Sequence, residues 1–176
     1  MTTNTTTKKT TSRTRKTTTK STPEKQVKLP ANPFVFEVLN LVCSQKTKEK
    51  KIEILKEYED PSLKAIFIWN YDESVQSAIP EGPVPYKENE VPVGTDHTSL
   101  RREYRNLYHF IKGGNDKLSS LRRETMFIQM LEGLHPQEAE IISLIKDKQL
   151  ETKYKIGFDV VKQAYPDIVW GNRSWV

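Results

Sequence analysis

The first 22 residues contain no carboxylate and, after Met1, no apolar side chain; they are Thr, Lys, Arg, Ser and Asn. A segment of this composition has no apolar surface to bury, and such burial is what offsets the conformational entropy lost on folding. We therefore expect residues 1–30 to form a disordered basic arm. We expect residues 31–176 to fold, and this number of residues is enough for one domain with one core.

The charge is divided unequally between these two parts. Residues 1–28 carry eight cations and one carboxylate, a net charge of +7, whereas the rest of the chain carries 20 cations and 22 carboxylates, a net charge of −2. A basic arm that neutralises phosphates releases counterions, so it binds nucleic acid in a sequence-tolerant and salt-dependent way. The arm has no aromatic residue on which bases could stack. We expect it to contact the phosphate backbone of duplex DNA or structured RNA through Lys8, Lys9, Arg13, Arg15, Lys16 and Lys20. The alternatives are an acidic protein surface as the ligand and a solubilising tail that binds nothing specific.

Apolar side chains recur at helical spacing along most of residues 34–164. The β-branched and aromatic run at 65–71 also fits a strand, but the capping signal before it favours a helix. We therefore predict an all-α domain, a single compact bundle of about six or seven short helices. The residues expected to cap or begin helices are Asn32-Pro33, Thr47, Asp60-Pro61, Asp96, Thr98 and His135-Pro136.

Two helices in the second half carry clustered arginines. The first, predicted over 100–111, ends at Gly113-Gly114, where a left-handed backbone suits glycine. If the next helix folds back on it, their arginines form a basic surface, and the planar guanidinium suits phosphate. The alternative is an ordinary solvated helix face, which the interleaved Glu103 and Glu124 favour. The candidate nucleic-acid-binding residues here are Arg101, Arg102 and Arg105, with Lys112, Arg122 and Arg123 nearby. The buried stripe expected on the second helix is Leu118, Leu121, Thr125, Ile128 and Leu131, widened by Phe127, Met130 and Leu134.

Residues 79–96 contain four prolines and two glycines, which exclude a helix. We favour an extended strap held over the helices by Val84, Tyr86 and Val91, with a binding loop as the alternative.

No constellation in the chain indicates catalysis. The three histidines lack metal-ligand spacing, the single Cys43 lies in an apolar helical stretch, and no phosphate-binding or nucleophile motif is present. We therefore expect a non-enzymatic protein without a metal or cofactor. No apolar run approaches the roughly 18 residues of a membrane span, so we expect no membrane association.

Several strings resemble an uncharacterised protein family of T4-like tailed phages, including cyanophages. These strings are Ile79–Tyr86 (IPEGPVPY), Tyr108–Asn115 (YHFIKGGN) and Met126–His135 (MFIQMLEGLH), followed by Glu138-Ala139 and Ile145–Lys148. The resemblance covers about 34–170 and leaves the arm outside. It supplies no activity or site residues, and it implies a bacterial host cytoplasm or a place in the virion.

These observations lead to one functional hypothesis and one alternative. The hypothesis is a non-enzymatic phage accessory protein whose helical domain docks on an unidentified phage or host protein while the arm holds nucleic acid. The alternative is a virion structural or assembly protein whose arm threads between subunits.

Overall fold

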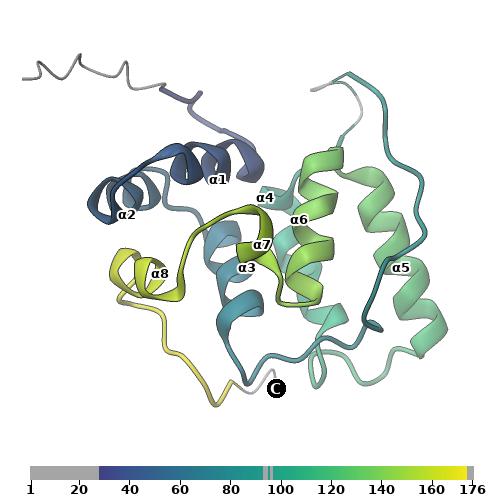
Figure 1. Cartoon of the computed structure of the whole chain (residues 1–176). Coiled ribbons are helices and arrows are strands. Elements are labelled where there is room, and N and C mark those ends of the chain that lie inside the picture. The colour runs from purple at the N-terminus through teal and green to yellow at the C-terminus, as the bar shows by residue number, and fades with distance from the viewer. Residues whose placement is uncertain (1–27, 93–94, 96, 174–176) are drawn as a thin grey trace, which may run out of the picture.

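The computed structural model describes residues 28–92, 95 and 97–173, and the regular elements in this part of the chain are all helices, without strands (Figure 1). The prediction of a compact all-α fold is confirmed, with eight α-helices and a 3₁₀-helix in these residues instead of six or seven helices. The elements are α1 (Val35–Ser44), α2 (Lys48–Glu57), α3 (Pro61–Tyr71), α4 (Leu100–Glu103), η1 (3₁₀, Tyr104–Phe110), α5 (Ser120–Gly133), α6 (Pro136–Lys146), α7 (Leu150–Lys153) and α8 (Phe158–Ala164).

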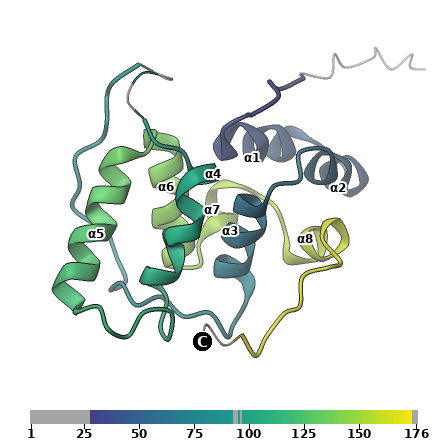
Figure 2. The same cartoon turned by 180° about the vertical axis from the view of Figure 1, so that it is seen from behind.

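Helices α3 and α6 pack together at the centre of the bundle (Figures 1 and 2). Helix α5 and η1 cover one side, and α1, α2 and α8 form the other. Segments distant in sequence close this second side: the Tyr165 hydroxyl donates to the Leu55 carbonyl oxygen at 2.8 Å, and Lys48 on α2 forms an ion pair with Asp159 on α8. Among the described residues, no helix is long and apolar enough to cross a membrane.

Local capping signals account for two of the helix starts. The Thr47 hydroxyl accepts from the Lys50 N–H at 3.4 Å, and the Asp60 carboxylate accepts from the Ser62 N–H at 2.9 Å. Pro61 occupies the first turn of α3, where its missing N–H costs no hydrogen bond. Residues 65–71 are therefore helical, as the capping signal predicted.

The predicted start of α1 at Pro33 is wrong by two residues. Helix α1 begins at Val35, and Asn32 and Pro33 lie before it. The reason is the Glu37 carboxylate, which reaches back and accepts from the Phe34 N–H at 2.8 Å. This contact fixes Phe34, not Asn32, as the capping position.

The buried stripe of α5 agrees with the prediction at Leu131 and differs from it at Leu121. Leu131 is fully buried, and so is Phe127, whereas Leu121 is 77% exposed. The Phe127 ring contacts the Phe110 ring of η1 edge to face, with 5.1 Å between centroids. Packing against η1 and α6 therefore selects the 127–131–134 face of α5, and Leu121 lies on the outer side.

A strap follows α3, as predicted, and Lys146 of α6 holds it in place. The Lys146 side chain is completely buried, and its ammonium donates to the carbonyl oxygens of Pro80 at 2.8 Å and Gly82 at 3.0 Å. Val84 and Tyr86 then pack against the core, as expected. Val91 is 40% exposed, so the prediction that it holds the strap is wrong.

Candidate functional site

The predicted nucleic-acid-binding residues fall into two groups. Those in the arm, Lys8, Lys9, Arg13, Arg15, Lys16 and Lys20, lie outside the described residues. The other three are described: Arg101 and Arg102 lie on α4, and Arg105 lies in the first turn of η1.

Arg101 is largely committed to contacts within the protein. Its Nε donates to the Pro33 carbonyl oxygen at 2.8 Å, and its Nη1 donates to the Asp60 carboxylate at 2.9 Å. The side chain thereby joins α4 to the segment before α1 and to the N-cap of α3. Arg101 is thus mainly a positioning residue, with part of its guanidinium left to face a ligand.

Arg102 and Arg105 are exposed. The Arg102 side chain makes no hydrogen bond or ion pair with another described residue. The Arg105 guanidinium lies over the Tyr104 ring, 5.7 Å from its centroid, and its Nε donates to the Tyr104 hydroxyl at 3.3 Å. Both cations can therefore reach an external anion.

Of the two arginines of α5, one is exposed and the other is bound within the protein. Arg122 is exposed. Arg123 donates to the carbonyl oxygens of His109 at 2.9 Å, Asn115 at 2.9 Å and Leu118 at 3.3 Å, so it closes the loop between η1 and α5. Some arginines of the predicted basic surface are therefore exposed, and others are bound to groups within the protein.

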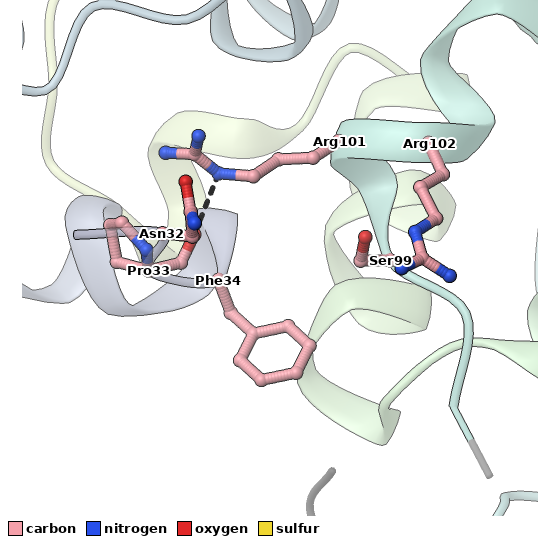
Figure 3. Close-up of a pocket in the computed structure, with 6 residues that line it drawn as sticks. All are labelled: Asn32, Pro33, Phe34, Ser99, Arg101 and Arg102. Atoms are coloured by element: carbon pink, nitrogen blue, oxygen red, sulfur yellow. Dashed lines mark hydrogen bonds between the residues drawn. The ribbon is translucent and has the colours of Figure 1, made fainter. Parts of the chain in front are cut away.

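A pocket of about 390 Å³ lies where α4 meets the segment leading into α1 (Figure 3). In Figure 3 the Arg101 side chain crosses from α4 to Asn32 and Pro33, and the Phe34 ring and the Arg102 side chain extend on separate sides below it. The residues that line this pocket are Asn32, Pro33, Phe34, Ser99, Arg101 and Arg102. We call it the arginine pocket.

A buried carboxylate on α6 holds the two sides of the arginine pocket together. Glu138 is completely buried; its Oε1 accepts from the Val35 N–H at 3.0 Å and its Oε2 accepts from the Leu100 N–H at 2.9 Å. One side chain therefore caps both α1 and α4. Burial raises the pKa of the Glu138 carboxyl to about 7, although the two backbone N–H groups act in the opposite direction.

This arrangement corrects one of the two predicted caps of α4, Thr98. Asp96 lies outside the described residues, and the Thr98 hydroxyl donates to the Glu103 carboxylate at 2.8 Å instead of capping the helix. The cap comes from Glu138, which is 38 residues further along the chain. Glu138 lies in the first turn of its own helix, and no local pattern indicates this distant partner.

Aromatic rings gather beside the arginine pocket. The Phe36 ring stacks on the His135 ring with centroids 4.6 Å apart, and the Phe34 ring lies 5.5 Å from Phe36 and 5.8 Å from His135. His135 caps α6, as predicted, because its Nδ1 accepts from the Gln137 N–H at 3.2 Å. Burial, and then the neighbouring His97, lower the pKa of His135. Within the described part of the chain, no group of His, Cys, Asp and Glu side chains could hold a metal ion.

Comparison with known proteins places the chain in a family but supplies no activity. Residues 38–152 match the family model described as "Family of unknown function (DUF6433)", and the chain belongs to this family. No curated protein matches the chain. No solved structure matches it either.

Proposed function

We propose that this member of the DUF6433 family is a non-enzymatic accessory protein that holds nucleic acid by its phosphate backbone. The observation that carries the proposal is the division of charge: residues 1–28 have a net charge of +7 and the rest of the chain has a net charge of −2. Such a division favours a basic arm that binds a polyanion. The domain beside it has a net charge close to zero, which suits docking on another protein.

The attachment point of the arm supports this proposal. The Leu29 N–H donates to the Tyr58 hydroxyl at 3.1 Å, which fixes the chain just after Lys28 on the domain. Three residues later, at Asn32, the chain begins to line the arginine pocket. A phosphate backbone held by the arm therefore comes close to Arg102, and Arg105 follows on the same short helical segment.

The domain supplies the second half of the proposed role, which is to dock on a phage or host protein. The strings over 79–148 that resemble proteins of T4-like tailed phages support an origin in such a phage and a place in the bacterial host cytoplasm. The alternative is a structural or assembly role in the virion. Mass spectrometry of purified particles separates the two, because a structural protein is present in stoichiometric amount.

The test of nucleic-acid binding is substitution of the arm cations. Replacing Lys8, Lys9, Arg13, Arg15, Lys16 and Lys20 by glutamine should abolish most binding to a labelled duplex at low salt. If these six cations each contact a phosphate, the slope of log K against log salt for the unmodified chain should be about −5. The measurement is fluorescence anisotropy over a salt series.

A charge-preserving control separates the charge of the arm from its sequence. Six Thr→Ser substitutions in residues 2–19 keep the net charge and should leave both the affinity and the salt slope unchanged. Equal binding by the glutamine variant and the unmodified chain would contradict the proposal.

A further inference from the structure

We propose that the arginine pocket receives an unpaired base of the nucleic acid that the arm holds, so that the protein prefers single strands to duplexes. This inference rests on the proposed function and adds to it a class of ligand. The arm alone, which has no aromatic residue, gives no reason to distinguish a single strand from a duplex.

The first support is the position of Phe34. This ring lines the pocket and is only partly buried, six residues after the last cation of the arm. Single-strand-binding proteins combine a basic path for the backbone with aromatic rings on which bases stack. Here the two components follow each other along the chain, with the basic segment first and the ring next.

The second support is the rigidity of the ring. Phe36 and His135 pack against Phe34, and the Glu138 carboxylate holds the neighbouring Val35 N–H. The Arg101 guanidinium holds the Pro33 carbonyl oxygen on the other side of Phe34. The ring is thus fixed before a ligand binds, which lowers the entropy cost of stacking.

The third support is the charge opposite the ring. Asp60 already pairs with Arg101, and the Glu37 carboxylate is bound to the Phe34 N–H. Arg102, which has no ion pair with another described residue, can therefore contact the phosphate next to a stacked base. A pocket of about 390 Å³ lies in the lower part of the range of roughly 300 to 1,000 Å³ found for small-ligand sites. In a duplex the bases are paired and stacked on each other, so they do not reach the ring.

The experiment compares a labelled oligothymidylate with a labelled duplex, using the full chain at low salt. The single strand should bind more tightly. Phe34→Leu, which keeps an apolar side chain but removes the π surface, should weaken single-strand binding about fivefold or more and leave duplex binding unchanged. Phe34→Tyr keeps an aromatic ring and should retain the preference. Circular dichroism checks that each variant is folded.

Two arginine variants locate the contact. Arg102→Ala should weaken single-strand binding and reduce the salt slope by about one phosphate contact. Arg122→Ala removes another exposed arginine, which lies on α5 outside the pocket, and should have a smaller effect.

The outcomes separate this inference from the proposed function. If the glutamine arm variant loses binding while Phe34→Leu changes neither ligand, the pocket inference is overturned and arm binding stands. Equal affinity of the unmodified chain for single strand and duplex also overturns the inference. If the unmodified chain binds neither ligand, the proposed function fails together with the inference.

Discussion

The Glu138 carboxylate receives the first N–H groups of α1 and α4 from within α6, in a site closed to water. Burying a charged carboxylate costs free energy, and burying an N–H group without an acceptor costs free energy as well. The two N–H groups satisfy the oxygens, but burial dominates, and the pKa of the carboxyl rises to about 7. The residue that joins these helices therefore also titrates near neutrality.

The raised pKa of Glu138 predicts how stability changes with pH. Because the folded pKa of about 7 exceeds the unfolded value of about 4.5, the contribution of Glu138 to stability is fully present below pH 4.5 and is lost as pH rises through 7. The loss is on the order of 2 to 3 kcal/mol. The His135 pKa is lowered, so its contribution is lost as pH falls, and a comparison of variants is needed to isolate Glu138.

Glu138→Gln provides that comparison. It should destabilise the protein at pH 5 by about 1 to 3 kcal/mol, because the amide N–H₂ cannot accept one of the two N–H groups. Between pH 5 and pH 8 the variant should lose less stability than the unmodified chain. Urea unfolding at several pH values measures both effects. Parallel pH profiles for the two proteins would show that Glu138 does not titrate in this range.

At the scale of elements, helix α5 shows how packing chooses one face of a helix. Its sequence offers the predicted stripe, which contains Leu121, Ile128 and Leu131, and a second apolar face, which contains Phe127 and shares Leu131. Contacts with η1 and α6 bury the second face. Spacing alone does not distinguish the faces, because both repeat at helical intervals.

A pair of leucine substitutions tests this assignment. Leu131→Ala should lower the free energy of unfolding by about 2 to 5 kcal/mol, because it opens a cavity among fully buried side chains. Leu121→Ala is the matched control and should change it by less than about 0.5 kcal/mol, since Leu121 is 77% exposed. Thermal or urea denaturation measures the difference. Similar losses in both variants would contradict the observed orientation of α5.

Whether a helix cap could be predicted from the sequence depended on how far apart along the chain the two bonded residues lie. Thr47 and Asp60 cap their helices through residues two or three positions away, so the sequence carries the signal locally. The link from Glu138 to Val35 spans 103 residues, and no local pattern reveals it. Residues 104–110 form a 3₁₀-helix, although the spacing of their apolar residues also fits an α-helix. The sequence therefore did not reveal the 3₁₀ geometry.

The candidate site follows the same rule. The exposure of Arg102 and Arg105 agrees with a polar helix face, which the sequence predicted. The commitment of Arg101 to Pro33 and Asp60, and the meeting of Phe34 with α4, required the tertiary structure. The pocket is therefore formed by segments more than 60 residues apart in the sequence. The sequence indicated the positive charge of this region but not the pocket.

At the scale of the whole molecule, the core is built from the helical domain. Every buried residue of the described structure lies at or after position 33. The contacts that carry the fold, such as the hydrogen bond from Lys146 to the strap and the ion pair between Arg101 and Asp60, also lie within the domain.

Deletion of residues 1–27 should therefore leave the stability of the domain unchanged to within about 0.5 kcal/mol. The deletion retains Leu29, whose N–H contacts Tyr58. Urea denaturation at moderate salt measures the free energy of unfolding of both forms. A large loss on deletion would show that the arm is part of the folded structure.

The pairing of α2 with α8 has a consequence for synthesis of the chain. The Tyr165 hydroxyl that binds the Leu55 carbonyl oxygen is translated 110 residues after it. At about 5 to 20 residues per second, a ribosome needs roughly 5 to 20 seconds to make that interval. During this time α2 lacks α8, the helix that packs against it. We therefore expect chaperones to bind the nascent chain until α8 has left the ribosome.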